Sequence, residues 1–220
     1  LGLSHDAITA LMGATEARPG IIVIAGTGSI SFGMNSTGRT ARVGGWGYVF
    51  GDEGSAFGIA RAALVAALRQ QEGWGPPTRL HRRILDFSEA KDIYEAMHKW
   101  YSLEFPRDRI ASFSQQVDEA ARAGDRVARR ILDSAAQELA LLAGHVRRRL
   151  FKPDERALVC YVGGVWKSRI MRHRFRKLVQ AQGNNRVVAP ALGPAAGALL
   201  AAYRNAGHTA VRLKNLSAHL

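Results

Sequence analysis

The stretch from Ile21 to Ser55, IIVIAGTGSISFGMNSTGRTARVGGWGYVFGDEGS, decides how this chain folds. It opens with an apolar run from Ile21 to Ala25, which is typical of a buried strand, and the turn sequence GTGS at 26–29 follows at once. Residues 30–34 and 39–43 alternate apolar with small or polar residues on either side of the turn sequence NSTG. We therefore expect strand, glycine turn, strand, turn and strand. This order is a β-meander and not the strand-to-helix step of a nucleotide-binding P-loop, whose Gly-Lys-Ser/Thr ending is missing here.

The rest of the chain has helical periodicity that is interrupted by two further strands. Helices are expected at 3–14, 55–71, 110–123, 126–150, 166–180 and 192–205, and as two short pieces within 78–107 that meet at Phe87 and Ser88. Strands are expected at 157–162 and 186–189. A meander followed by strand-helix-strand-helix predicts an α/β fold, with helices packed on a mixed sheet.

The composition indicates a globular protein with one large domain. The 220 residues are 47% hydrophobic and 22% charged, and no apolar run approaches the ~20 residues of a membrane span. The N-terminal residues lack the pattern of a signal peptide. The single cysteine, Cys160, lies in an apolar run and cannot form an internal disulfide. We therefore expect a reducing, cytoplasmic location and no association with a membrane.

The formal net charge of +13 is large, and basic clusters occur at 81–83, 147–149 and 172–177. Three interpretations are open: solvated helix faces, a general attraction for anionic nucleotides, and nucleic-acid binding. The clusters lie on segments with helical periodicity, and no recognition-helix, zinc-finger or ribonucleoprotein signature accompanies them. We therefore expect solvated helix faces and no nucleic-acid partner.

The glycine turn at 26–29 has two interpretations. Its glycines leave backbone N–H groups unshielded, and Thr27 and Ser29 add hydroxyl donors, so the turn could form a concavity for an anion. An ordinary hairpin explains the same four residues. The sequence GGVW at 163–166 is ambiguous in a similar way, because the start of a helix suits either a phosphate group or a tight connection.

The second glycine cluster, GGWGYVFGDEGS at 44–55, is more specific, because a hairpin does not need so many glycines. Trp46 could present the face of its ring to a sugar, and Asp52 could accept hydrogen bonds from paired hydroxyls. Alternatively, Trp46 belongs to the core and Asp52 caps the helix that follows, and the two kinds of role can coexist.

Asp6 lies in the first turn of the first expected helix, where its charge is favourable to the helix dipole. As a carboxylate it could also act as a general base for a hydroxyl. The seven histidines are scattered without metal-ligand spacing, and no Gly-x-Ser-x-Gly motif is present. Both interpretations of Asp6 are open from these residues alone.

Taken together, the motifs resemble those of a known family. They are Asp6-Ala7, IIVIAGTGS at 21–29, GGWGYVFGDEGSA at 44–56, AGD at 123–125, VGGVWKS at 162–168 and LGPAAGALLAA at 192–202. In this order they are similar to the N-acetylglucosamine kinase branch of the BadF/BadG/BcrA/BcrD ATPase family, within the sugar kinase, Hsp70 and actin superfamily. The resemblance implies a C-terminal, ribonuclease H-like (actin-like) ATPase domain over residues 1–206. It also implies a helical insertion at about 73–150 and a flexible tail at 207–220.

The resemblance implies a role for two groups of residues. Those similar to the family's second phosphate hairpin and adenosine positions are Gly26, Thr27, Gly28, Gly124, Gly164 and Ser168, with Thr27 touching ATP. Those similar to its sugar-pocket positions are Ser29, Trp46, Gly47 and Asp52. Asp6 matches the aspartate that accepts the proton from the sugar's 6-hydroxyl. The implied activity is phosphorylation of an amino sugar, N-acetylglucosamine or glucosamine, with ATP and Mg²⁺.

The chain departs from the family pattern at two places. The family's first phosphate hairpin, of the type Asp-Gly-Gly-Gly-Thr, is absent, and we expect it to lie in an N-terminal domain that this chain lacks. Ile30 stands where some animal members carry Asn, which leaves recognition of an acetamido group open. Two alternatives remain: a BadF-type ATPase that activates a partner enzyme, and an inactive remnant with a regulatory or nucleic-acid-binding role. The oligomeric state is also open, and a homodimer is one alternative.

Overall fold

A computed structural model describes residues 6–208 together with 211 and 213, and of Asp6 it describes only the backbone. The elements in chain order are α1 (Asp6–Thr15), β1 (Gly20–Ala25), β2 (Ser29–Met34), β3 (Thr40–Gly44), α2 (Ala56–Gln71), α3 (Leu80–Ser88), α4 (Ile93–Trp100), α5 (Arg107–Ser112), α6 (Ser114–Arg122), α7 (Arg126–Leu150), β4 (Ala157–Val162), the 3₁₀ helix η1 (Gly164–Lys167), α8 (Arg169–Ala181), β5 (Asn185–Val188) and α9 (Pro194–Asn205).

The strands form one mixed sheet in the order β3-β2-β1-β4-β5. β1, β2 and β3 pair antiparallel, and Ala25 faces Ser29 across the glycine turn. On the other side of β1 the pairing is parallel, first with β4 and then between β4 and β5. The expected meander and the expected mixed sheet of an α/β fold are both confirmed.

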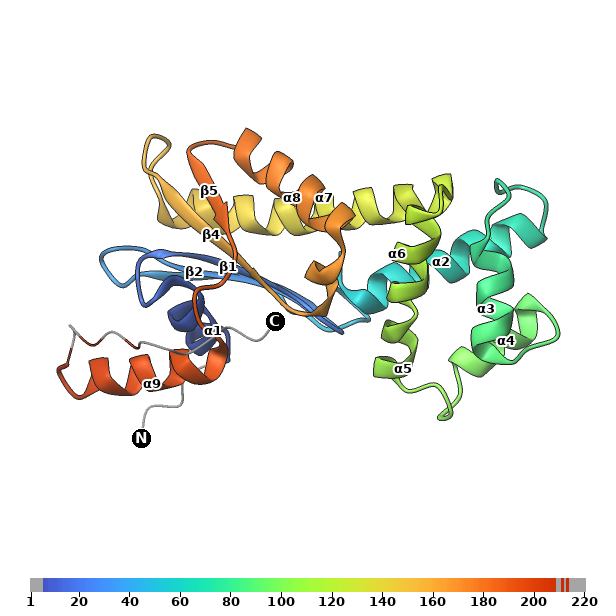
Figure 1. Ribbon diagram of the computed structural model, residues 1–220, viewed down its shortest axis with the longest axis horizontal. Helices are drawn as coiled ribbons and strands as arrows, with labels where there is room; N and C mark the ends of the chain where they lie inside the picture. Colours follow the sequence, from blue (N-terminus) through green and yellow to red (C-terminus); the bar gives the residue numbers. More distant parts are fainter. Residues whose placement is uncertain (1–5, 209–210, 212, 214–220) are drawn as a thin grey trace.

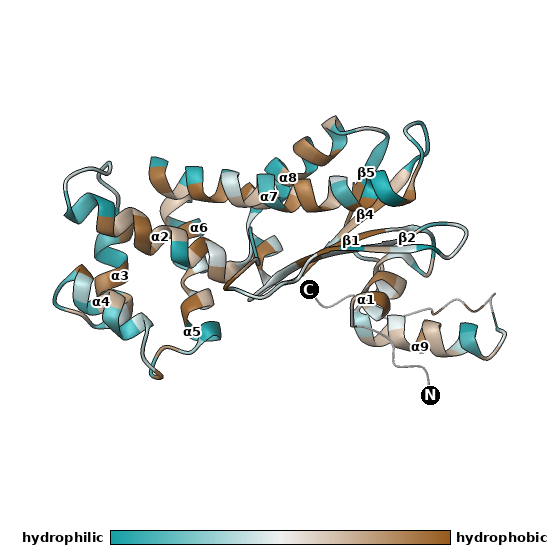
Figure 2. Cartoon of the chain, turned by 180° about the vertical axis from the view of Figure 1, so that it is seen from behind, coloured by the Kyte–Doolittle hydropathy of each residue, from teal (hydrophilic) through white to brown (hydrophobic). Residues whose placement is uncertain are grey.

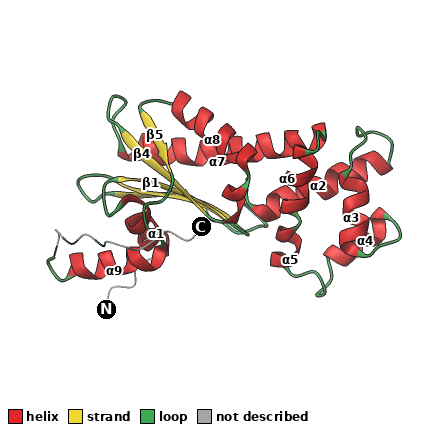
Figure 3. Cartoon of the chain, viewed as in Figure 1, coloured by secondary structure: helices red, strands yellow, loops and turns green. Residues whose placement is uncertain are grey.

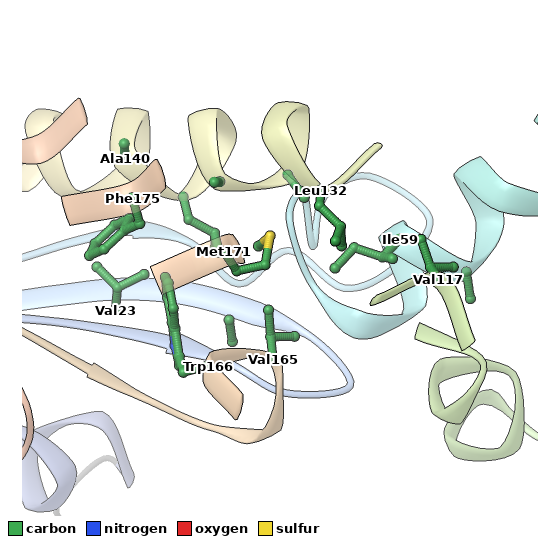
Figure 4. Packing of buried hydrophobic residues seen from close by; sticks show 14 of the residues in the cluster. Val23, Ile59, Val117, Leu132, Ala140, Val165, Trp166, Met171 and Phe175 are labelled. Carbon is green, nitrogen blue, oxygen red and sulfur yellow. The ribbon is translucent and has the colours of Figure 1, made fainter. Parts of the chain in front are cut away.

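Helices cover both faces of this sheet, with α7 and α8 on one face and α1 and α9 on the other (Figures 1 and 3). The side chains of β1 alternate between these two layers because successive residues of a strand point to opposite faces. Ile21 and Val23 join the core under α7 and α8, where Figure 4 shows Val23 close to Phe175. Ile22 packs with Cys160 against α1. The central strand is thus buried on both sides, as its unbroken apolar sequence predicts.

The long helix α7 joins the sheet to a separate helical lobe, formed by α2 to α6 at one end of the sheet (Figure 1). Along α7, hydrophilic and hydrophobic bands alternate (Figure 2), because its buried residues recur at helical spacing. The helix begins at the cap residue Asp125, whose carboxylate accepts hydrogen bonds from the backbone N–H groups of Val127 and Ala128. The Thr78 hydroxyl and the Arg79 N–H donate to its other oxygen, which fastens the lobe to this end of the helix.

Several helix boundaries differ from those expected. The break near Phe87 and Ser88 lies further on, because α3 continues to Ser88 and Asp92 caps α4. The single helix expected at 110–123 is two helices, which meet at the fully buried Phe113 and begin already at Arg107. The helix expected at 166–180 is divided by Ser168 into η1 and α8.

The ends of the chain are described only in part. The expected cap residue Ser4 and most of the tail at 207–220 lie outside the described residues. Among the helices that are described, none combines the length and the apolar character that a membrane span requires.

Candidate functional site

The glycine turn joins β1 and β2 at the end of the sheet that faces the helical lobe (Figure 1). The Gly26 carbonyl accepts a hydrogen bond from the Ala56 N–H at 2.8 Å, which ties the turn to the start of α2. Neither Gly26 nor Gly28 has a backbone φ in the left-handed region. A Cβ at Gly28 would lie 2.8 Å from Asp52 Oδ1, whereas a Cβ at Gly26 would meet no atom within 4 Å. Asp52 therefore requires glycine at position 28, but no described residue requires it at position 26.

Asp52 is a buried carboxylate beside this turn, and its side chain is held from two directions. The residue is 5% exposed and adopts a left-handed φ of 64°, which Asp tolerates better than most residues. Its Oδ1 accepts a hydrogen bond of 2.9 Å from the Ser29 N–H, and its Oδ2 accepts one from the Arg107 guanidinium. The cap of α2 is Ser55, whose Oγ accepts from the Gly58 N–H at 3.0 Å. The alternative that the Asp52 side chain caps α2 is therefore wrong.

Trp46 and Gly47 lie on the loop between β3 and α2 that leads to Asp52. Trp46 is 73% exposed, so the alternative that it belongs to the core is also wrong. The Arg42 guanidinium lies 5.8 Å from the centre of its ring. Gly47 has a φ of 81°, a conformation that glycine adopts without strain. The loop thus presents an accessible aromatic ring close in sequence to the buried carboxylate.

A cavity of about 600 Å³ lies between the sheet and the helical lobe. Gly26, Thr27, Gly164 and Ser168 line it from the sheet side, and Asp108 and Asp118 are among the residues that line it from α5 and α6. Its volume is in the range of pockets for small ligands, which is ~300–1,000 Å³. Four residues that the family resemblance assigned to nucleotide binding are thus brought to one cavity from two distant parts of the chain.

The two glycines of this cavity fit a phosphate group. At Gly164, as at Gly26, a Cβ would meet no atom within 4 Å, and φ is not in the left-handed region. Neither backbone conformation nor protein packing explains the two glycines, and both line the same cavity. The Gly26 N–H donates to the Gly28 carbonyl oxygen at 2.9 Å, so Gly26 contributes open space and not a free donor. That space, with the exposed hydroxyl of Thr27 beside it, fits the phosphates of a nucleotide.

Ser168 reaches the lobe across the cavity. Its hydroxyl donates a short hydrogen bond to Asp118 Oδ1 and accepts one from the Met171 N–H at 3.2 Å, which caps α8. Asp118 also pairs with Arg122 at 2.9 Å. Gly124 is not among the described residues that line the cavity. It follows α6 with a φ of 89°, a conformation typical of the glycine after a helix end.

Gly28 and Ser29 belong to the Asp52 side of the turn. The Ser29 hydroxyl is engaged with the Glu53 carbonyl oxygen at 2.7 Å, and the residue is buried. Asp6 opens α1, a helix that packs on β1, but its side chain lies outside the described part of the structure. Its suggested role as a base stays a prediction.

Two residues that the structure brings into the site, Arg107 and Asp118, could not be recognised from the sequence. Arg107 follows Asp52 by 55 residues and begins α5, in a stretch without glycines or other motif chemistry. Asp118 lies on the surface pattern of an ordinary amphipathic helix, α6. Their partners, Asp52 and Ser168, become apparent only when the lobe is packed against the sheet.

The described residues contain no group of three or more His, Cys, Asp or Glu side chains that could hold a metal ion. Mg²⁺ commonly keeps several waters and is bound by one or two carboxylates together with substrate phosphates. The side chains here therefore fit a Mg²⁺ ion carried with a nucleotide better than a permanently caged one.

Comparison with known proteins decides the family. A profile of the BadF/BadG/BcrA/BcrD ATPase family matches residues 2–202. The chain belongs to this family. The resemblance drawn from the motifs is confirmed, and so is the actin-like α/β fold that it implied.

Individual relatives are similar over most of the chain. An N-acetylmuramic acid/N-acetylglucosamine kinase of Clostridium acetobutylicum is 40% identical over 80% of this chain and 58% of its own length. An N-acetyl-D-glucosamine kinase of Dictyostelium discoideum is 29% identical over 92% of this chain and 65% of its own. The crystal structure of a Chromobacterium violaceum protein, provisionally named an N-acetylglucosamine kinase, superposes with a TM-score of 0.74. It is 31% identical and aligns with 90% of this chain and 64% of its own. The chain thus spans less than two thirds of the length of these relatives.

Proposed function

We propose that the complete protein containing this chain transfers the terminal phosphoryl group of ATP to the 6-hydroxyl of an amino sugar, N-acetylglucosamine or glucosamine. One observation carries the proposal: the two ends of a single glycine turn face two different sites. Gly26 and Thr27 line the cavity, while the Ser29 N–H binds the buried carboxylate of Asp52. Phosphoryl transfer depends mainly on holding donor and acceptor in the right positions, and a turn shared by both sites does this.

The cavity is the proposed nucleotide site. Thr27 is exposed there and offers a hydroxyl beside the empty space at Gly26. Gly164 and Ser168 line the same cavity from the sheet side, at the start of η1 and of α8. Bound Mg²⁺ would neutralise charge on the phosphates of ATP. Gly28 and Gly124 were also assigned to the nucleotide, but the structure gives them conformational or packing reasons of their own.

The loop from Trp46 to Asp52 is the proposed sugar site. A carboxylate accepts about four hydrogen bonds, so Asp52 keeps capacity for hydroxyl donors after binding Ser29 and Arg107. The exposed ring of Trp46 offers a flat apolar face to a sugar ring, and the neighbouring Gly47 carries no side chain that could obstruct it. Asp6 is the proposed general base, which would orient the 6-hydroxyl and accept its proton.

The test is ADP release by the complete protein, measured with a panel of hexoses and amino sugars. We expect stimulation by N-acetylglucosamine or glucosamine, and position-specific analysis of the product should place the phosphate on the 6-hydroxyl. Asp6→Asn should reduce kcat by at least a hundredfold, in keeping with general-base contributions of about 10²–10⁴. Asp86→Asn, at an exposed acid of α3, is the control and should leave turnover unchanged. If no sugar stimulates ADP release, the kinase proposal fails; if Asp6→Asn is as active as its control, only the base assignment fails.

The alternative of an ATPase that activates the iron–sulfur chemistry of a partner gains no support from the cysteine. Cys160 is fully buried in β4, and its thiol contacts the Ala14 carbonyl oxygen at 3.5 Å. Burial raises the pKa of Cys160 to about 12, so the thiolate that a cluster requires is strongly disfavoured. A panel without any active sugar would make this alternative the next one to test.

A further inference from the structure

Arg107 is the residue through which the helical lobe reaches the proposed sugar site. It is the first residue of α5, and its guanidinium forms an ion pair with Oδ2 of Asp52. The side chain of Asp52 is 6% exposed and that of Arg107 is 36% exposed, so the contact is largely screened from water. No other described basic side chain pairs with Asp52. Within the described part of the chain, the lobe thus supplies the one cation that compensates the buried carboxylate.

The guanidinium is itself held by its surroundings. Its central carbon lies 5.2 Å from the ring centre of Tyr48 and 5.9 Å from that of Phe57. A planar guanidinium packs against such rings in a way that the ammonium of lysine does not reproduce. Its Nε is buried and has no partner among the described residues, and the hydrogen bond to Asp52 is made through Nη2.

The arrangement fixes the Asp52 carboxylate at both oxygens and leaves its remaining hydrogen-bond acceptor positions free. Ser29 binds Oδ1 and Arg107 binds Oδ2, and both contacts close around Gly28. A Cβ at Gly28 would lie 2.9 Å from Arg107 Nη2 as well as 2.8 Å from Asp52 Oδ1. Without Arg107, one oxygen of the carboxylate would lose its partner, and the side chain could rotate away from the orientation that a sugar hydroxyl meets.

We propose that Arg107 is a positioning residue for the sugar acceptor, which holds the Asp52 carboxylate in the orientation that binds the sugar hydroxyls. The proposal rests on the proposed kinase function. It assigns to the lobe a part in sugar binding, in addition to its residues Asp108 and Asp118 at the cavity. Because Arg107 is not among the residues that line the cavity, its effect should fall on the sugar and not on ATP.

The experiment compares Arg107→Gln and Arg107→Lys in the complete protein, with KM measured separately for the sugar and for ATP. We expect Arg107→Gln to raise the sugar KM at least tenfold and to change the ATP KM by less than twofold. Arg107→Lys keeps the charge without the planar fork and should give an intermediate sugar KM. The control is Lys99→Gln, which removes a cation of the same lobe that is 27% exposed and paired with Glu95 at 3.3 Å. It should leave both KM values unchanged.

Calorimetric titration of the sugar without ATP should show the same loss of affinity. The proposal is overturned if Arg107→Gln leaves the sugar KM within twofold of the unmodified protein, or raises both KM values equally, as a general loosening of the lobe would. If Arg107→Gln does not fold, the test uses Arg107→Lys with a melting temperature equal to that of the unmodified protein. A raised sugar KM with an unchanged ATP KM then supports the proposal, and an unchanged sugar KM overturns it. An unmodified protein that phosphorylates no sugar refutes the proposed function itself, whereas an active one with an unaffected Arg107 variant refutes only this inference.

Discussion

Replacing either glycine of the 26–29 turn with alanine should separate the two sites that the turn serves. Neither position has a φ in the left-handed region, so the expected difference between them comes from the space around the new methyl group. At Gly28 the Cβ would lie 2.8 Å from Asp52 Oδ1, and Asp52 cannot yield without leaving Ser29 and Arg107. At Gly26 the Cβ meets no described atom within 4 Å.

The magnitudes follow from these contacts. Loss of a hydrogen bond to a charged group costs about 1.5–3 kcal/mol, and alanine recovers about 0.4–1 kcal/mol by restricting the unfolded chain. Gly28→Ala should therefore lower the free energy of unfolding by about 1–2 kcal/mol. For a domain of this size that corresponds to a melting temperature lower by about 2–8 °C. Gly26→Ala should leave stability unchanged or raise it by up to about 1 kcal/mol.

The assay combines thermal unfolding of the 220-residue chain with steady-state kinetics of the complete protein. We expect Gly28→Ala to raise the sugar KM at least tenfold, and Gly26→Ala to raise the ATP KM while the sugar KM stays within twofold. An unchanged melting temperature and sugar KM in Gly28→Ala would show that Asp52 is not held as described. An unchanged ATP KM in Gly26→Ala would show that the cavity does not bind the nucleotide.

Three further predictions concern stability and its dependence on pH. Gly197→Ala would place a Cβ 1.9 Å from the Thr9 carbonyl oxygen, where α9 crosses α1. Urea denaturation should therefore show that the free energy of unfolding falls by about 3 kcal/mol or more. The control Leu199→Ala, at an exposed position of the same helix, should lower it by less than about 0.5 kcal/mol. Burial alone would raise the pKa of Asp125, but hydrogen bonds from the Ala128 N–H and three other donors outweigh burial and lower that pKa. The ionised Asp125 therefore stabilises the folded chain at neutral pH, and this stabilisation is lost as pH falls through the folded-state pKa. Asp125→Ala should cost about 1–2 kcal/mol at pH 7 in urea titrations and less at pH 3, and an equal cost at both would contradict the charged cap. Burial raises the pKa of the Cys160 thiol from 9.0 to about 12. The free energy of unfolding should therefore fall as pH rises from 9 to 12, because the thiol ionises more readily in the unfolded chain. Cys160→Ala should flatten that part of the stability profile, and the native thiol should resist alkylation at pH 8 until urea unfolds the chain.

The sheet could be predicted well because its information is local. The apolar run of β1, the turns that follow it and the alternation in β2 and β3 all lie within 25 consecutive residues. Adjacent antiparallel strands joined by short turns pair with each other in most folds. The break at Phe113 could not be predicted, because it interrupts the helical pattern by a single residue. Phe113 packs against Phe87 and Trp100 in the lobe, and these long-range contacts place it there.

The candidate site could be predicted only in part for the same reason. Trp46 and Asp52 each had two interpretations, because a residue next to a glycine can serve the core, a helix cap or a ligand. The structure removes one interpretation of each through exposure and hydrogen bonding. Arg107 lies 55 residues from Asp52, and the intervening sequence carries no periodicity that would bring them together. Tertiary packing alone creates that contact.

The helix α7 restricts where residues can be inserted into this fold. It runs unbroken for 25 residues, about 37 Å, and touches α6 and α2 as well as all three strands of the meander. One residue inserted midway would turn one half by about 100° against the other, so the buried faces of the two halves could no longer both meet their partners. Insertions should be excluded from α7 and tolerated in the exposed segment 101–104 between α4 and α5. Natural variants and engineered fusions of this domain should therefore carry additional residues in the segment 101–104 of the lobe.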